Sequence, residues 1–211
     1  MKLTKYVHSC LLAEEQGTTV LVDPGSYTIE EGALHIDTLE KLDFVLITHE
    51  HQDHLYVPFL KQIIEKFPAV LVISNGAVVD LLSKEGIQAS IQGTEKIEMI
   101  DAPHEKLLSV PPHNVLFHLF GRLTHPGDSF QFSESKEILA LPVQAPWGSM
   151  VAALEKAVEL RPKLVVPIHD WHWNEKARKA LYAMAESYLQ RHDIEFHGLE
   201  AGESLDIIHG S

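Results

Sequence analysis

The sequence predicts an α/β fold in which mixed β-sheets are covered by outer helices. Two observations support this class: short apolar runs rich in β-branched residues alternate with helix-like segments, and two amphipathic helices follow in the second half of the chain. The 211 residues, of which 45% are apolar and 22% charged, suffice to bury a core without disulfide or metal staples. We therefore expect a single domain over residues 1–211. A metal bound to it would be required for function and not for folding.

The first expected strands form a hairpin near the amino end. Residues 2–12 and 18–22 predict two strands joined by a polar Glu-Glu-Gln-Gly turn. The turn signal Asp23-Pro24-Gly25 then begins a loop that runs to about residue 40. Further strands are expected in the apolar runs at 44–48, 70–74, 97–100, 115–120, 130–132, 138–143 and 163–168.

Four helices are expected between these strands. Residues 57–66 and 76–84 fit the first two. In the other two, apolar residues recur at helical spacing behind candidate N-caps, Ser149 for one helix and Asn174 for the other. The recurring residues are Val151, Leu154 and Val158 in the first of these, and Ala177, Leu181, Met184 and Tyr188 in the second.

Composition restricts the partners. The formal net charge of −13 argues against broad binding to nucleic acid or anionic lipid, because both require a field of Lys and Arg. The single cysteine, Cys10, cannot form an internal disulfide, and no segment approaches the roughly 20 apolar residues of a membrane helix. We expect a cytoplasmic protein with a small-molecule substrate and no nucleic-acid or membrane partner; the sequence leaves a homo-oligomer open.

Histidines are concentrated in the stretch ITHEHQDHL, residues 47–55, directly after an apolar run. Chance assembly of His-x-His-x-Asp-His in a chain of this composition is on the order of one in a few hundred. Neutral imidazole is the commonest ligand for zinc, and a carboxylate beside it extends the choice to manganese or iron. The spacing lets His49 and His51 serve one ion while Asp53 and His54 serve a second. The alternative is a surface histidine patch.

The HEHQDH motif after a buried strand resembles the signature of the metallo-β-lactamase superfamily. That resemblance implies a four-layer αββα sandwich with a dinuclear metal site at the edge where its two sheets meet. Further matches are spread over nearly the whole chain, in the motifs LVDP, DAPHE, THPGDS and VVPIHDW. Within the superfamily, the HPGDS-like and PIH-like motifs are most similar to small hydrolases related to ascorbate phosphate lactonases.

The resemblance implies a role for one residue in each of these motifs. Asp23 resembles an aspartate that braces the metal loop, and His104 resembles the third ligand of the first metal. Asp128 resembles the carboxylate that bridges both ions, and His169 the final ligand of the second metal. The implied ligand set is His49, His51, Asp53, His54, His104, Asp128 and His169.

Alternatives stay open for the scattered ligands. His113 competes with His104, which we favour because it directly follows a strand. Asp128 could be an ordinary turn aspartate, and His169 could be a core histidine. His125 is expected to hold its loop by hydrogen bonds, as groups that support a metal site often do.

Substrate contacts are the least constrained part of the expected site. His172, between two tryptophans, could protonate a leaving group or simply pack. Arg122 and Lys106 could meet a phosphate or carboxylate, or be ordinary solvated cations. Trp147 could wall the pocket or anchor it. No function is expected for the histidines toward the chain end, His192, His197 and His209.

The implied function is hydrolysis of a small soluble lactone, ester or phosphate ester through a metal-bridging hydroxide. Two ions about 3.5 to 4 Å apart lower the pKa of a shared water from about 15.7 to about 7. This removes roughly 12 kcal/mol from the free energy of making hydroxide at neutral pH. Asp53 is expected to orient this hydroxide and accept its proton. Zinc is the expected metal, with manganese or iron as alternatives.

Two other functions are possible on the same scaffold, and the sequence favours neither. The redox flavodiiron branch of the superfamily usually carries Glu at the position of His51, and such iron-dependent oxygen chemistry should bring a flavin domain or a second cysteine system. A non-catalytic metal-binding protein should lack at least one ligand, whereas all seven candidates are present. Zinc β-lactamases typically use cysteine where Asp128 lies, so antibiotic hydrolysis is not expected.

Overall fold

The computed structural model of the chain describes residues 1–208. The chain divides into two compact units, Met1–Gly93 with Leu199–Ser211, and Thr94–Gly198. Each unit contains its own six-stranded sheet and its own apolar core. The single domain expected over residues 1–211 stays a prediction, and His209 lies outside the described residues.

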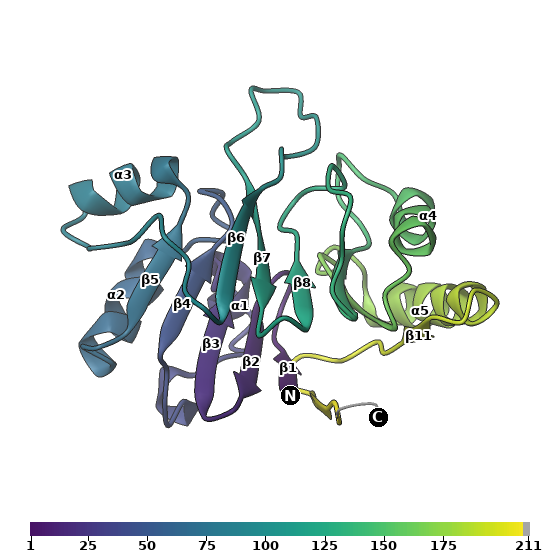
Figure 1. Ribbon diagram of the computed structural model, residues 1–211, viewed down its shortest axis with the longest axis horizontal. Helices are drawn as coiled ribbons and strands as arrows, with labels where there is room; N and C mark the ends of the chain where they lie inside the picture. Colours follow the sequence, from purple (N-terminus) through teal and green to yellow (C-terminus); the bar gives the residue numbers. More distant parts are fainter. Residues whose placement is uncertain (209–211) are drawn as a thin grey trace. The chain divides into compact units, whose positions relative to one another are not determined.

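The sheet of the first unit has the strand order β12-β1-β2-β3-β4-β5 (Figure 1). Its strands are β1 (Lys2–Lys5), β2 (Leu11–Glu15), β3 (Thr18–Val22), β4 (Phe44–Ile47), β5 (Leu71–Ser74) and β12 (Ser204–Asp206). β2 pairs antiparallel with both β1 and β3, whereas β3, β4 and β5 pair in parallel. Therefore β1, β3, β4 and β5 run in one direction, and their carboxyl ends lie at one edge of the sheet.

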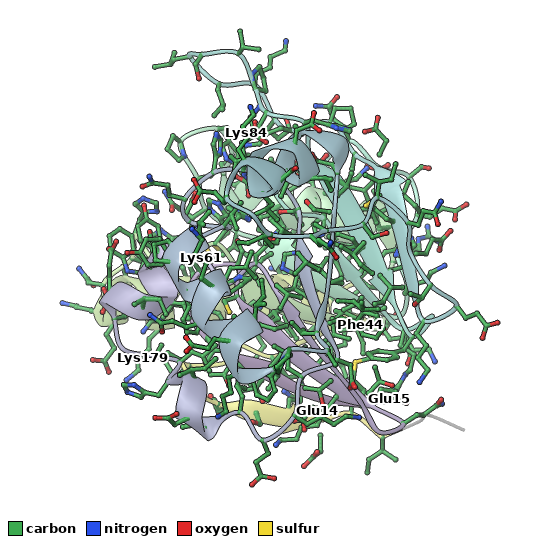
Figure 2. The ribbon with its side chains drawn as sticks, turned by 90° about the vertical axis from the view of Figure 1, so that its left-hand side faces the viewer. Glu14, Glu15, Phe44, Lys61, Lys84 and Lys179 are labelled. Atoms are coloured by element: carbon green, nitrogen blue, oxygen red, sulfur yellow. The ribbon has the colours of Figure 1, made fainter. Side chains whose placement is uncertain are left out.

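Helices of the first unit bury their apolar sides in its core. They are α1 (Ser26–Glu30), the 3-10 helix η1 (Ile36–Thr38), α2 (Val57–Lys66) and α3 (Gly76–Lys84). α2 and α3 lie beside β4 and β5 (Figure 1). One apolar cluster includes Phe59, Leu60 and Ile63 from α2, Val78 and Leu82 from α3, and Val45 and Ile47 from β4. Lys61 and Lys84, on the exposed sides of α2 and α3 (Figure 2), show that both helices are amphipathic.

The sheet of the second unit has the strand order β11-β10-β9-β8-β7-β6. Its strands are β6 (Ile97–Asp101), β7 (Val115–Leu119), β8 (Leu123–His125), β9 (Ile138–Pro142), β10 (Leu164–Ile168) and β11 (Glu195–Phe196). β7 pairs antiparallel with β6 and β8, and the pairs from β8 to β11 are parallel. The carboxyl ends of β6, β8, β9 and β10 therefore also share one edge.

Two capped helices complete the second unit, α4 (Met150–Leu160) and α5 (Glu175–Gln190). The predicted caps are confirmed: the Ala152 N–H donates to the Ser149 side chain (3.3 Å), and the Ala177 N–H donates to the Asn174 side chain (2.9 Å). The core of this unit includes Ala153, Leu154 and Ala157 from α4, Ala185 and Leu189 from α5, Leu139 and Leu141 from β9, and Val165 from β10.

The expected α/β class is confirmed, since mixed sheets and flanking helices are present in both units. The predicted helices at 57–66 and 76–84 match α2 and α3 at both ends. None of the helices formed by residues 1–208 combines the length and apolarity that crossing a membrane requires.

The prediction of one strand over 2–12 is wrong, because the chain turns between β1 and β2. The Tyr6 N–H donates to the Cys10 carbonyl (2.9 Å), and the Cys10 N–H donates to the Val7 carbonyl (3.0 Å). Within this turn His8 has a φ of 61°, in the left-handed region that a strand cannot contain. The segment thus forms an antiparallel pair of strands, and the hairpin predicted after it is confirmed as β2 and β3.

The strand expected at 130–132 is also absent, because side chains take its backbone donors. The Phe130 N–H donates to Glu105 Oε1 (3.0 Å), and the Gln131 N–H donates to Ser129 Oγ (2.9 Å). The three-residue strand β8 lies just before it instead, and β8, β11 and β12 had no sequence prediction. The loop expected from residue 23 to about 40 contains α1 and η1.

Candidate metal centre

Polar residues from three parts of the chain follow co-directional strands of the first unit. Asp23 follows β3, the HEHQDH stretch follows β4 through Thr48, and His8 follows β1. The Asp23 N–H donates to the Leu46 carbonyl (2.9 Å), which fixes the residues after β3 beside the end of β4. Because co-directional strands end at the same edge of a sheet, residues that are remote in sequence meet there.

Asp23 is a buried anchor for the histidine loop. Its carboxylate accepts hydrogen bonds from the Thr48 N–H (2.8 Å) and the Thr48 hydroxyl (2.8 Å). It also lies 2.7 Å from Nδ1 of His54, and because an ionised carboxylate only accepts, His54 donates. This bond fixes the ring of His54 and leaves its Nε2 as the ligand atom.

His49 and His51 face one another across a short gap. His49 Nε2 lies 3.0 Å from His51 Nδ1, and the two rings meet edge to face with centroids 4.7 Å apart. The other ring nitrogen of His49 lies 3.1 Å from the Thr48 hydroxyl. Two imidazole nitrogens this close can share one proton or bind one cation.

Asp53 and His54 are joined by a third residue, His8, for which the sequence predicted no role. Asp53 Oδ2 lies 3.1 Å from His8 Nε2 and 3.9 Å from His54 Nε2. Each of the three offers a ligand atom within 4.8 Å of the other two. The missed signal was positional: a buried histidine follows a strand that runs in the same direction as β3 and β4.

Gly25 allows the histidine loop to pack closely on the residues after β3. A Cβ added at Gly25 would lie 1.8 Å from the backbone oxygen of Asp53, a separation that non-bonded atoms cannot adopt. The neighbouring Ser26 N–H donates to the Gln52 carbonyl (2.7 Å). Glycine is therefore required here by a close approach of two backbones.

Three polar residues also follow co-directional strands of the second unit, and here they meet around one carboxylate. His104 follows β6, Asp128 follows β8 and His169 follows β10. His104 Nε2 lies 3.3 Å from Asp128 Oδ2, and His169 Nε2 lies 3.1 Å from Asp128 Oδ1. Each oxygen of one carboxylate thus faces one imidazole nitrogen.

The other nitrogen of each of these imidazoles points at a backbone carbonyl. His104 Nδ1 lies 2.7 Å from the Glu105 oxygen, and His169 Nδ1 lies 2.6 Å from the Gln144 oxygen. A carbonyl can only accept, so both rings donate from Nδ1. In its neutral form each ring then presents a lone pair at Nε2, which is the form that binds metals.

Trp147 and His125 support Asp128 and its loop. The indole N–H of Trp147 donates to Asp128 Oδ2 (3.1 Å), and its ring packs edge-on against His104 and His169 with centroids 5.9 and 5.4 Å away. The Gly127 N–H approaches His125 Nδ1 at 3.4 Å. Trp147, expected as a pocket wall or an anchor, thus has a direct polar contact with the carboxylate.

Arg122, a predicted substrate contact, is not brought to this edge. It precedes β8, whereas Asp128 follows the opposite end of that strand. Its Nε donates to Glu137 Oε1 (2.6 Å), and this bond holds the pKa of Glu137 below its usual range. The guanidinium is buried and its charge is compensated locally.

The structure also shows the surroundings of two further candidate histidines, His113 and His172. His113, the alternative to His104, lies 2.6 Å from Asp101 Oδ1 through its Nε2 and has a half-exposed side chain. His104 is the one that faces Asp128. His172 is exposed in the loop after His169, with its ring edge-on to Trp171 at 5.2 Å.

The donor atoms in both units are imidazole nitrogens and carboxylate oxygens. Zinc accepts this combination, and so do manganese and iron. Several of these ligand residues are oriented by further hydrogen bonds. His54 donates to Asp23 in the first unit, and in the second His104 and His169 donate to backbone carbonyls while Asp128 accepts from Trp147. Such orientation is typical of metal ligands. The residues present therefore fit divalent metal ions.

Comparisons with known proteins agree with this chemistry. A family model described as a beta-lactamase superfamily domain matches residues 2–169. The chain is 32% identical over 184 residues to Protein Rv0786c of Mycobacterium tuberculosis, which covers 81% of this chain and 84% of that protein. It is 28% identical over 181 residues to a UPF0173 metal-dependent hydrolase of Caldivirga maquilingensis, which covers 77% of this chain and 78% of that one.

A solved structure has the same fold. Igni18, described as a novel metallo hydrolase from the archaeon Ignicoccus hospitalis, matches with a TM-score of 0.71 and 24% identity over 99% of both chains. The metallo-β-lactamase fold expected from the motifs is therefore confirmed. Relatives in sequence and neighbours in structure both include proteins named as metal-dependent hydrolases or metallo hydrolases.

Proposed function

The chain belongs to the beta-lactamase superfamily, and from this premise we propose that it is a dinuclear metal-dependent hydrolase of a small soluble substrate. One observation carries the proposal. His54, His104 and His169 each donate from Nδ1 and each present Nε2 to a carboxylate oxygen at 3.1 to 3.9 Å. A lone pair and a carboxylate attract one another only when a proton or a cation lies between them.

We assign the seven predicted ligands to two ions. His49, His51 and His104 would hold the first ion, Asp53, His54 and His169 would hold the second, and Asp128 would serve both. The assignment is supported within each unit, since His49 and His51 have close ring nitrogens and Asp128 offers one oxygen to each of its two histidines.

When bound, two such ions supply an ionised water at neutral pH and polarise the bond under attack. The protein's own residues orient the reactants. Asp53 directs the attacking water through its carboxylate and takes up a proton there. Trp147 restrains the Asp128 carboxylate through its indole N–H. His172, exposed beside His169 in the chain, is the candidate for protonating the leaving group.

The substrate class we propose is a lactone, ester or phosphate ester, with zinc as the native metal and the cytoplasm as the location. The nitrogen and oxygen donor set supports zinc, although it fits manganese or iron as well. Arg122 is left out of the substrate site because it is buried against Glu137 at the other end of β8.

Metal analysis joined to a substrate panel tests this function. Protein purified without added metal should contain two equivalents of zinc or manganese and should turn over at least one member of a panel of lactones, phosphodiesters and thioesters. Removing the metal with a chelator should abolish turnover, and restoring it should recover turnover. Iron accompanied by oxygen consumption, or an absence of bound metal, would contradict the proposal.

A further inference from the structure

His8 occupies an unusual position in the first unit. It is one of the seven residues other than glycine with a positive φ among residues 1–208, and its side chain is fully buried. Two others of this group are Asp23 (φ 47°) and His169 (φ 65°), which lie among the candidate metal residues. Left-handed backbone at a non-glycine residue costs free energy and is often kept where function requires it.

The ring of His8 is held in one orientation. It packs edge to face against Tyr27, with centroids 5.2 Å apart and planes at 83°, and against His54, with centroids 5.8 Å apart and planes at 76°. Its Nε2 then lies 3.1 Å from Asp53 Oδ2. A fully buried ring that packs against two other rings has little room to turn, so this nitrogen stays directed at Asp53.

The carboxylate of Asp53 needs such a partner. Its backbone is fixed by the close packing of Gly25, but its side chain is 23% exposed and has two rotatable bonds of its own. A carboxylate free to rotate loses conformational freedom when it binds an ion, which weakens binding. A hydrogen bond from a buried ring removes that freedom beforehand.

We propose that His8 is a positioning residue that donates its Nε2–H to Asp53 Oδ2 and so fixes this carboxylate for the second metal ion. The pair reverses the arrangement at Asp23, where a buried carboxylate orients the imidazole of His54. The proposal rests on the proposed function, since it assumes that Asp53 is a ligand. Loss of a group that orients a metal ligand typically costs about 10- to 100-fold in metal affinity.

A rival role for His8 is direct ligation, because its ligand atom lies within 4.8 Å of those of Asp53 and His54. A hydrogen-bond donor to Asp53 and a metal ligand can be distinguished by the side chain that replaces the imidazole. A glutamine amide can donate a hydrogen bond from about the place of Nε2 but is a poor metal ligand. An asparagine tolerates left-handed backbone well but is shorter, so it preserves the turn and loses the bond.

The test measures the affinity of the second ion by competition with a chelating dye, without reference to turnover. His8→Asn should weaken that affinity by about 10- to 100-fold, and His8→Gln should recover most of the loss. The matched control is His118→Gln, which removes a buried histidine that lies 2.9 Å from the Thr124 hydroxyl in the other unit. It should leave the affinity of both ions unchanged.

A double-mutant cycle tests whether His8 affects metal affinity through Asp53. In an Asp53→Asn background, His8→Asn should cause no further loss of affinity, because the carboxylate that it positions is gone. Thermal unfolding of the metal-free variants checks that each is folded. Equal loss in His8→Asn and His8→Gln would indicate ligation and overturn the proposal, and so would unchanged affinity in both.

The outcomes separate this inference from the proposed function. If the wild-type protein does not bind two ions, the proposed function fails. If it binds two ions and the His8 variants bind them equally well, only the role of His8 fails.

Discussion

The two units present the same kinds of ligand, yet they hold them in different ways. In the first unit four candidate ligands lie within the six residues from His49 to His54, and the supporting bonds come from side chains, chiefly Asp23. In the second unit three ligands follow three different strands, and both imidazoles are oriented by backbone carbonyls. Single substitutions of supporting side chains should therefore release the imidazole of His54 in the first unit, whereas they cannot remove the backbone carbonyls that orient His104 and His169 in the second.

The largest expected effect comes from Asp128, which is the common neighbour of both histidines in its unit. Asp128→Asn should lower kcat/KM by about 10³-fold or more, since an electrostatic contribution of several kcal/mol is lost. Metal content and kcat/KM on the best substrate measure this. Full activity in this variant would remove Asp128 from the site.

The contrast between side-chain and backbone support can be tested directly. Asp23→Asn should weaken metal affinity by about 10- to 100-fold, because His54 loses the charged acceptor at its Nδ1. Gln144→Ala should have almost no effect on affinity, because His169 uses the backbone oxygen of residue 144. Chelator competition measures both. Equal losses in the two variants would break the comparison between the units.

Close packing of the histidine loop predicts an effect on stability. Gly25 has a φ of −78°, which any residue can adopt, so Gly25→Ala acts only through the contact with the Asp53 backbone. Overpacking of this kind typically costs about 1 to 3 kcal/mol in the free energy of unfolding. Gly76→Ala is the matched control, since nothing lies within 4 Å of its added Cβ. Urea unfolding of both variants without metal should show loss only in the first.

The smallest expected effect concerns Arg122. Arg122→Gln should leave kcat/KM unchanged and lower the free energy of unfolding by about 1 kcal/mol, because Glu137 is partly exposed. The bond holds the pKa of Glu137 below its ordinary value of 4.5, so its contribution is present above that pH and is lost as the pH falls below it. The difference from wild type should therefore shrink in acid. A large rise in KM would instead assign Arg122 to the substrate.

Much of the fold could be predicted because its elements are long enough to show a period. α2 and α3 were bounded correctly, and the caps at Ser149 and Asn174 were identified from residue type and position. β8, β11 and β12 have only two or three residues, which is too short for any pattern to emerge. The stretch FQF was mistaken for a strand because the bond from the Phe130 N–H to Glu105 depends on tertiary structure.

The site residues that form a local sequence pattern could likewise be predicted, and those that depend on tertiary structure could not. The loop from His49 to His54 is visible as a contiguous motif, whereas the preference for His104 over His113 depended on its place directly after a predicted strand. His8 was missed because the segment Lys-Tyr-Val-His-Ser-Cys resembles the continuation of a strand. Only the turn between β1 and β2 places it at the carboxyl end of β1.

The two turns that join β1, β2 and β3 should differ in how they tolerate changes of length. The turn at Gln16 and Gly17 lies between β2 and β3, at the edge of the sheet opposite to the histidine loop. Extra residues there, an inserted epitope tag for example, would extend into solvent. A single residue added between Lys5 and Leu11 would instead carry His8 out of reach of Asp53, so evolutionary drift in loop length should be confined to the first of these places.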